Sequence, residues 1–238
     1  MSRCSSPAPA LSIVIPVLND DLALQTNLVD LESRNDSGFP FEVIVANGNS
    51  AGQAETAAIC EQHGALHLVS PPGRGAQMNT GARASRGTLL LFLHADCRLP
   101  PDAVARLTTL GGDACWGSFK HRIDGASPLL RVIEWGANTR AGRFGLPYGD
   151  QAIFCARSLF ERVGGYREEP LLEDVLLARA LGRLSRPVQI DSMVRTDPRR
   201  WEARGVLRTT WINWEIMIRF WCGERDFERL ARRYRARR

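Results

Sequence analysis

Strand-like and helix-like segments alternate over the first hundred residues of this chain. Short apolar segments, expected to be strands, cover residues 11–17, 41–46, 65–69 and 89–93. After the first of these strands, Leu24, Leu28 and Leu31 have helical spacing, and Asn19 and Asp20 are the expected caps of that helix. A second helix is expected over residues 53–63. This alternation predicts a mostly parallel α/β sheet with helices on both faces.

The apolar segment 89–93 stops abruptly at His94-Ala95-Asp96-Cys97. Side chains two apart on a strand point the same way, so His94 and Asp96 are expected to lean together from its carboxyl end. Ligands bind at that edge of an open parallel sheet. A carboxylate beside an imidazole can hold a divalent cation, and a cation with few protein ligands keeps positions for substrate phosphates. The pattern therefore predicts a phosphate ester or diphosphate as the substrate.

Length and composition are those of an ordinary soluble globular chain. Its 238 residues, 44% hydrophobic and 24% charged, are enough for one substantial core with appendages. No segment approaches the roughly 18 to 20 uncharged apolar residues that a spanning helix requires. The six cysteines form no Cys-x-x-Cys pair and the start lacks a signal-peptide pattern, which favours reduced thiols in a cytoplasmic protein.

The pattern loosens after Pro100-Pro101. Glycines and aromatic residues become frequent between Gly111 and Gly149, which predicts substrate-shaping segments in place of regular layers. Further along, a strand is expected over residues 151–155 and a short helix over 158–163. Longer helices are expected over 173–184 and 205–222.

The C-terminal end combines an aromatic stripe with a basic tail. Trp211, Trp214, Ile218 and Trp221 fall on one stripe of the expected last helix, and seven arginines follow between residues 225 and 238. One interpretation is peripheral docking at the inner membrane surface, which would present a lipid-linked acceptor. The other is a core helix or homodimer contact with a solvated arginine tail. Nucleic-acid binding is not expected, because no recognition motif accompanies the basic residues.

Five segments in order resemble the family 2 glycosyltransferases. They are Ile13-Val14-Ile15-Pro16 with Asn19, the segment from Gly75 to Ala82, the strand ending in His-Ala-Asp, Gly164-Gly165-Tyr166, and Glu173-Asp174. The resemblance covers residues 12–201 and implies an inverting, nucleotide-sugar-dependent enzyme of the GT-A fold. It implies a transferase domain at 1–204 with a helical, basic extension at 205–238 packed on the same domain. His-Ala-Asp, Gly149-Asp150-Gln151 and Arg199-Arg200-Trp201 also resemble a bacterial subgroup of soluble transferases associated with arsenosugar biosynthesis or selenodomains.

The resemblance implies roles for the acidic residues. Asp96 matches the last acid of the family's Asp-x-Asp motif, which binds Mg²⁺ or Mn²⁺ at the donor diphosphate. His94 stands where many relatives have the first Asp, and it is either a weak ligand, which suits Mn²⁺ better than Mg²⁺, or a hydrogen-bond donor to the nucleotide. Glu173 and Asp174 open a helix, whose dipole favours ionised carboxylates. Asp174 matches the general base that takes the proton of the acceptor hydroxyl, and Glu173 supports its orientation.

Further residues are expected to bind the donor, a UDP- or GDP-linked sugar, or the acceptor. Arg74 lies in a loop before a helix, which suits an anion. An arginine pair could bind phosphate, and Trp201 could stack on a sugar or base. Asp150 and Gln151 either bind acceptor hydroxyls or cap a turn. The expected binding residues are Pro16, Asn19, Asn47, Arg74, Gln77, Asn79, His94, Asp150, Gln151, Arg199, Arg200 and Trp201.

One segment departs from the family pattern. Relatives typically carry an Asp at the positions of Asn47 and Gly52, where it helps to hold the base and ribose, and an amide cannot present a carboxylate. The alternative to an active transferase is therefore a transferase-like protein that binds nucleotide or sugar without catalysis. A sugar nucleotidyltransferase is the third hypothesis, disfavoured because the segment Pro16-Val17-Leu18-Asn19 lacks a glycine-rich phosphate loop.

Overall fold

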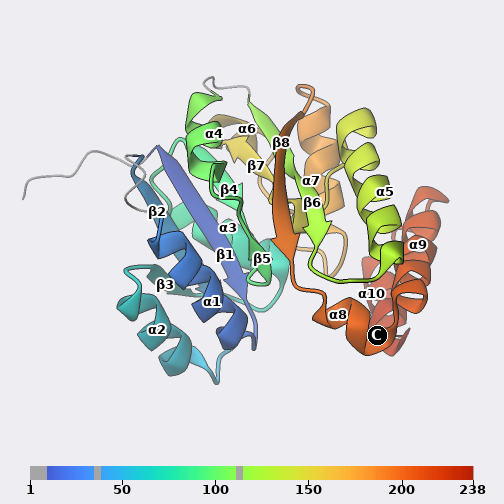
Figure 1. Cartoon of the computed structure of the whole chain (residues 1–238), viewed down its shortest axis with the longest axis horizontal. Helices are drawn as coiled ribbons and strands as arrows, with labels where there is room; N and C mark the ends of the chain where they lie inside the picture. The colour runs from blue at the N-terminus through green and yellow to red at the C-terminus, as the bar shows by residue number, and fades with distance from the viewer. Residues whose placement is uncertain (1–9, 35–38, 111–114, 238) are drawn as a thin grey trace, which may run out of the picture.

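A computed structural model describes residues 10–34, 39–110 and 115–237, apart from the side chain of Arg200. Its eight strands form one sheet with helices on both faces (Figure 1). The strands are β1 (Leu11–Val17), β2 (Phe41–Asn47), β3 (Leu66–Val69), β4 (Leu89–Phe92), β5 (Cys97–Arg98), β6 (Trp116–Ile123), β7 (Phe154–Ala156) and β8 (Val188–Thr196). In space they follow the order β3-β2-β1-β4-β7-β6-β8-β5.

Helices connect and cover these strands. In chain order they are α1 (Asp21–Glu32), α2 (Gln53–Gln62), α3 (Arg74–Ala84), α4 (Ala103–Thr109), α5 (Pro128–Phe144), α6 (Arg157–Arg162), α7 (Glu173–Gly182), α8 (Arg199–Arg204), α9 (Val206–Trp221) and α10 (Phe227–Arg237). A short 3-10 turn, η2, spans Gly149–Gln151.

The N-terminal half is a parallel sheet, as predicted. β1 pairs in parallel with both β2 and β4, and β2 pairs in parallel with β3. The apolar stripe of α1, including Leu24 and Leu28, is buried in the core on one face of the sheet. Helices α3 and α7 bury Met78 and Leu177 in a second core cluster on the other face. The predicted α/β class with helices on both faces is confirmed.

The sheet continues beyond β4 and curls. β7 pairs antiparallel with β4 and β6, β6 pairs in parallel with β8, and β5 pairs antiparallel with β8. Only four residues separate β4 from β5 in the sequence, yet they lie far apart in the sheet order, and β5 also contacts α1. The far end of the sheet therefore returns toward the segment that carries His94 and Asp96 (Figure 1).

The prediction for residues 111–149 is wrong where the structure describes them. Residues 111–114 lie outside the described part, and the rest contains β6 and the 17-residue helix α5. β6 buries Gly117, Ser118 and His121 as well as the apolar Trp116, Phe119 and Ile123, so polar and apolar residues do not alternate along it and the two-residue pattern that marks a strand is lost.

Two local predictions also need correction. The strand expected at 151–155 begins at Phe154, because residues 149–151 form η2. Asp20 is the residue before α1, but its side chain makes no capping hydrogen bond, and Asn19 lies in the turn with a φ of 57°.

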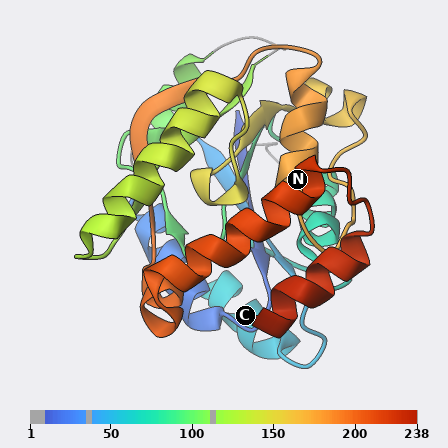
Figure 2. The same cartoon turned by 90° about the vertical axis from the view of Figure 1, so that its right-hand side faces the viewer.

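The C-terminal helices α9 and α10 pack on α7 and on each other. Leu172 and Val175 share a buried cluster with Phe220 of α9 and Leu230 of α10. Figure 2 shows α9 and α10 crossing the face that is on the right in Figure 1. The tryptophan stripe is not in this cluster, so its interpretation as a core stripe is wrong. Within the described ranges, no helix is long and apolar enough to cross a bilayer. A domain boundary at residue 204 stays a prediction.

Candidate active site

A cleft of about 380 Å³ opens at the carboxyl ends of β1 and β4. It brings together segments far apart in the sequence: β1 and its turn, the start of α3, the loop after β4, the segment before α7, and α10. The lining residues are Pro16, Leu18, Asp20, Gly73, Arg74, Gln77, His94, Ala95, Asp96, Glu169, Pro170, Leu171, Glu173, Ala231, Tyr234 and Arg235. The predicted residues His94, Asp96, Arg74 and Glu173 thus meet at the sheet edge where parallel strands present ligands.

The loop after β4 presents His94 and Asp96. Buried Asn27 of α1 donates from Nδ2 to the carbonyl oxygens of His94 and Ala95 at 3.3 Å and of Cys97 at 2.7 Å, which fixes this loop against α1. One potential ligand atom from each of His94, Asp96 and Cys97 lies within 4.8 Å of the other two. Burial raises the pKa of the Cys97 thiol, so the thiol stays protonated. Burial lowers the pKa of His94, which favours the neutral imidazole.

Asp174 lies at the second position of α7 and is held by two backbone groups. Its Oδ2 accepts the N–H of Gly149 at 2.7 Å, and its Oδ1 accepts the N–H of Val175 at 2.7 Å. A Cβ at position 149 would lie 2.5 Å from His94 Nε2 and 3.5 Å from Asp174 Oδ2. The absence of a side chain at Gly149 therefore lets η2 approach both side chains and joins the loop after β4 to the start of α7.

Glu173 faces the cleft with a side chain only 9% exposed. Its Oε1 lies 3.8 Å from Nη1 of Arg74, whose side chain is half exposed at the start of α3. Burial raises the pKa of Glu173 to about 7, the charge of Asp174 adds to the rise, and Arg74 opposes it. Glu173 therefore exchanges its proton near neutral pH.

The turns around this site hold unusual backbone conformations. Among the described residues, three that are not glycine have positive φ: Asn19 (57°), Ala152 (47°) and Leu172 (66°). They lie between β1 and α1, directly after η2, and directly before Glu173. Such conformations cost free energy and persist where the surrounding packing imposes them. At Leu172 that packing comes from α9 and α10, so the C-terminal helices support the turn that orients the acid pair.

Gln77 lines the cleft, but its amide group supports the backbone. Nε2 donates to the carbonyl oxygen of Val17 at 2.6 Å and to that of Ala46 at 2.9 Å. The side chain is 2% exposed and ties the ends of β1 and β2 to α3. Its Nε2 donors are therefore committed to the backbone.

Asn47 and Asn79, both expected to contact the donor, are positioned to hold loops. Asn47 is fully buried, donates from Nδ2 to Thr56 Oγ1 at 2.8 Å and accepts the N–H of Asn49 at 2.8 Å. Asn79 donates to the carbonyl oxygen of Tyr166 and accepts its N–H, both at 2.9 Å. Neither lines the cleft, and a direct contact with the donor stays a prediction.

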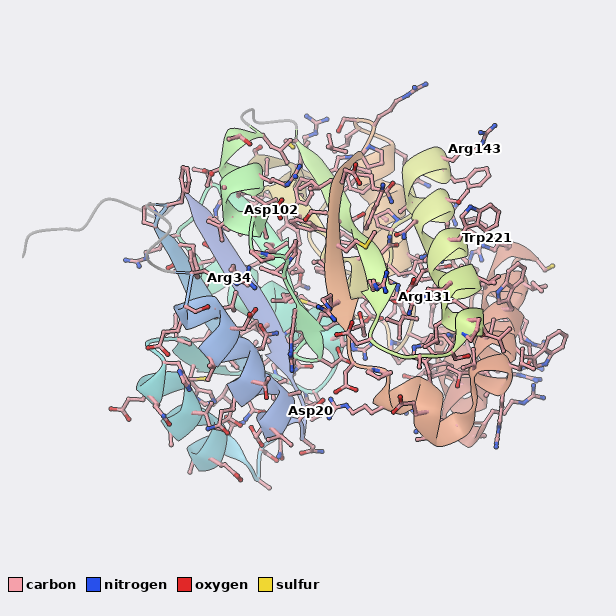
Figure 3. All side chains as sticks on the ribbon, viewed as in Figure 1. Asp20, Arg34, Asp102, Arg131, Arg143 and Trp221 are labelled. Atoms are coloured by element: carbon pink, nitrogen blue, oxygen red, sulfur yellow. The ribbon has the colours of Figure 1, made fainter. Side chains whose placement is uncertain are left out.

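The segment from Arg199 to Trp201 lies beside the site. Nη2 of Arg199 pairs with Oδ2 of the cleft residue Asp20 at 2.5 Å, so the arginine bridges the turn after β1 and α8. Arg199 also lines, together with Asp96, a second cleft of about 300 Å³, and its contact with phosphate stays a prediction. Figure 3 labels Asp20 below the sheet, beside α8. Trp201 is 9% exposed and packs with Ile123, and its expected stacking on a sugar or base stays a prediction. The side chain of Arg200 lies outside the described part.

Gln151 and Asp150 take separate roles. Gln151 is fully buried, and its Oε1 accepts the N–H of Tyr148 at 3.3 Å, so of the two alternatives it caps the turn. Asp150 is partly exposed, and its Oδ2 lies 3.7 Å from Nε2 of His121. That histidine nitrogen is also 2.9 Å from Oγ1 of Thr196. A contact between Asp150 and an acceptor stays a prediction.

Sequence reasoning missed the contribution of α10. Tyr234 and Arg235 line the cleft, although the sequence pattern indicated only a basic tail. Leu230, Ala231 and Tyr234 recur at helical spacing, which could have indicated a packed helix face but not its location. Asp96 also borders a second cleft of about 300 Å³ between α1 and the end of β8.

This chain has the GT-A fold of glycosyltransferases, a curled α/β sheet with acidic groups at its carboxyl edge. Two solved glycosyltransferase structures share this fold. Mannosyltransferase PcManGT from Pyrobaculum calidifontis, in complex with GDP-Man and Mn²⁺, superposes with a TM-score of 0.65 over 97% of this chain and 74% of its own, at 14% identity. TarS 1-349 from S. aureus, in complex with UDP-GlcNAc, gives a TM-score of 0.58 over 79% of this chain and 58% of its own, at 16% identity. At such identities the likeness shows the fold alone.

The model of glycosyl transferase family 2 matches residues 12–160, and the chain belongs to this family. Dolichyl-phosphate beta-glucosyltransferase of Mus musculus is 30% identical over 104 residues, which are 38% of this chain and 32% of the relative. Undecaprenyl-phosphate 4-deoxy-4-formamido-L-arabinose transferase of Pseudomonas paraeruginosa is 27% identical over 182 residues, which are 71% of this chain and 54% of the relative. The chain thus spans about a third to a half of the length of these curated relatives.

Proposed function

We propose that the chain is an inverting, metal-assisted glycosyltransferase that transfers a sugar from a nucleotide diphosphate to an acceptor hydroxyl. The observation that carries this proposal is that Asp96 and Glu173 line one cleft at the carboxyl edge of the sheet. Asp174 follows Glu173 directly and is held by the N–H of Gly149. Transfer needs a group that stabilises the departing diphosphate and a base that takes the acceptor proton. Acids from two different elements, the loop after β4 and the start of α7, suit these two tasks.

The loop after β4 fits a divalent metal. Asp96 offers a carboxylate oxygen and His94 a neutral imidazole nitrogen within 4.8 Å of each other. A mixed oxygen and nitrogen donor set suits Mn²⁺ better than Mg²⁺. Bound there, the metal would supply positive charge against the departing diphosphate. The Mn²⁺ and GDP-Man in the PcManGT complex support this assignment.

Asp174 is the proposed general base. Each of its oxygens accepts one backbone N–H, so the carboxylate is held in place and keeps lone pairs for an acceptor hydroxyl. The acceptor oxygen bonds to the anomeric carbon, the bond from that carbon to the diphosphate breaks, and the acceptor proton passes to Asp174.

Arg74 is the proposed protein ligand of the donor phosphates. It lies in the cleft at the amino-terminal end of α3, where the helix dipole favours anions. Its contact with Glu173 is loose at 3.8 Å, and its side chain is half exposed, so a phosphate can replace that partner.

A protein that binds nucleotide without catalysis is the second candidate. Asn47 is buried, and its partner Thr56 also donates to Oδ1 of Asp21 at 2.6 Å. At position 47, where the family pattern has an Asp, this chain has an Asn whose amide hydrogen-bonds inside the protein, to Thr56. This candidate predicts nucleotide binding with no transfer.

For the acceptor we propose a small molecule or a lipid-linked group. The two relatives named for dolichyl phosphate and undecaprenyl phosphate support a lipid-linked acceptor. The choice between a UDP- and a GDP-linked donor, membership of the arsenosugar or selenodomain subgroup, a cytoplasmic location and a homodimer stay predictions.

Calorimetric titration tests the donor site. UDP and GDP are titrated, each with and without Mn²⁺, into the wild type, Asp96→Ala and the control Asp191→Ala, which changes a highly exposed acid on β8. We expect Mn²⁺-dependent binding of one nucleotide by the wild type and the control, and its loss in Asp96→Ala. A nucleotide affinity that changes neither when Mn²⁺ is left out nor in Asp96→Ala would refute the proposed metal site. Donor turnover that depends on Asp174 then separates a transferase from an inactive binding protein.

A further inference from the structure

Helix α9 carries two apolar stripes on opposite sides. Ile212, Ile216 and Phe220 are buried against the body of the protein. The other stripe is exposed: Leu207 (71%), Trp211 (68%), Trp214 (64%), Ile218 (51%) and Trp221 (49%). One buried stripe is enough to attach an amphipathic helix, so the exposed stripe has no function in the fold of this chain. A large apolar surface of this kind marks an interaction site.

Helix α5 extends this apolar surface. Val132 and Trp135 on α5 are 64% and 71% exposed. α5 and α9 contact each other and lie side by side on the right of Figure 1, the side that faces the viewer in Figure 2. We call these two residues together with the exposed stripe of α9 the α5–α9 face.

The segment that carries α9 is also the source of the positive charge of the chain. Residues 205–238 contain nine arginines and four acidic residues, which accounts for the whole formal net charge of +5. Two of the acids are already neutralised: Glu215 pairs with Arg219 and Arg237, and Glu224 pairs with Arg219 and Arg229. Arg208 is exposed on α9, and Arg143 and Trp221 both point outward on the right of Figure 3. Two exposed arginines, Arg208 on α9 and Arg143 on α5, thus accompany the apolar residues of the α5–α9 face.

We propose that the α5–α9 face docks on the surface of an anionic lipid bilayer. Tryptophan suits the interface between lipid headgroups and acyl chains, because its ring is apolar and its N–H is polar. Arginines around an apolar stripe add attraction to anionic headgroups. A second copy of the chain suits the face less well, because pairing would bring two segments of the same positive charge together. The docking does not depend on the proposed transfer reaction.

Vesicle co-sedimentation of the full chain tests this surface. The wild type is mixed with phosphatidylglycerol/phosphatidylcholine vesicles and with pure phosphatidylcholine vesicles. The variants are the double substitution Trp211→Ser with Trp214→Ser, the charge variant Arg208→Gln, and the control Val69→Ser, which changes an equally exposed apolar residue on β3. All these positions are exposed, and thermal unfolding checks that each variant is folded.

We expect the wild type and Val69→Ser to bind the anionic vesicles and to bind pure phosphatidylcholine much less. The tryptophan double variant should bind at least about tenfold more weakly, and Arg208→Gln should show a smaller loss that high salt removes. Absence of binding to anionic vesicles, or binding unchanged by the tryptophan substitutions, would overturn the proposal. A dimer in light scattering that the same substitutions dissociate, without vesicle binding, would assign the face to a second copy instead.

Discussion

The backbone N–H of Gly149 donates a 2.7 Å hydrogen bond to Oδ2 of Asp174, across 25 residues of sequence. The same glycine lies so close to His94 that a Cβ at its position would be 2.5 Å from Nε2 of the imidazole. One turn thus lies between the proposed base and the proposed metal site: it binds Asp174 through its backbone and leaves His94 its space by the absence of a side chain.

Replacing Asp174 by Asn should abolish most of the turnover. An amide keeps the size of the side chain but cannot take a proton, and a general base contributes about 100- to 10,000-fold to a rate. Donor turnover should fall within that range while nucleotide affinity, measured by calorimetry, stays near that of the wild type. The exposed acid Asp191 is the matched control, as Asp191→Asn. Full turnover in Asp174→Asn would remove this residue from the mechanism.

Gly149→Ala should lower turnover without unfolding the protein. The new methyl group would displace His94, and misplacing a reacting group by about 1 Å can cost about 100-fold in rate. Gly136→Ala on α5 is the control, because a Cβ there meets no atom within 4 Å and alanine favours a helix. Steady-state kinetics and thermal unfolding separate the two effects. Wild-type kinetics in Gly149→Ala would show that the close approach has no role.

Stability should fall as the pH rises from 5 to 8 because of Glu173. Its pKa is about 7 in the folded protein and near 4.5 when unfolded, so between these values the folded state binds more protons. The stabilisation is complete below pH 4.5 and is lost as the pH rises through 7, at a cost on the order of 3 kcal/mol.

Denaturant unfolding of Glu173→Gln at several pH values measures this effect. A neutral amide does not titrate, so the variant should lose less stability than the wild type between pH 5 and 8. Glu61→Gln, at an exposed position on α2, should follow the wild-type profile. Parallel pH profiles for the wild type and Glu173→Gln would contradict the raised pKa.

Gln77→Ala should destabilise the fold before it affects any ligand. The substitution removes the buried hydrogen bonds to the carbonyl oxygens of Val17 and Ala46, although that of Val17 keeps the N–H of Gly48 at 3.0 Å. We expect a loss of about 1–3 kcal/mol in the free energy of unfolding. Gln62→Ala, at an exposed position on α2, should change it little. A stable variant with weaker nucleotide binding would instead make Gln77 a direct ligand.

The sequence by itself determined the parallel half of the fold and the acids of the site. Apolar segments marked β1, β2 and β4, and the helical spacing of three leucines marked α1, because these elements bury apolar side chains on one or both faces. The position of Asp96 in the loop after β4 follows from local order alone, as does that of Glu173 at the start of α7. A strand end and a helix start are local features, and sequence patterns record them.

Only the tertiary structure decided which of these residues face a common cleft. Asn47, Asn79 and Trp201 occur in family-like segments, yet their side chains are turned toward other loops or into the core. α10 enters the cleft from more than 200 residues after β1. The strand β6 was hidden because it buries polar and apolar side chains that do not alternate along the sequence. The orientation of a side chain depends on the partners that surround it in space, and those partners come from distant parts of the chain.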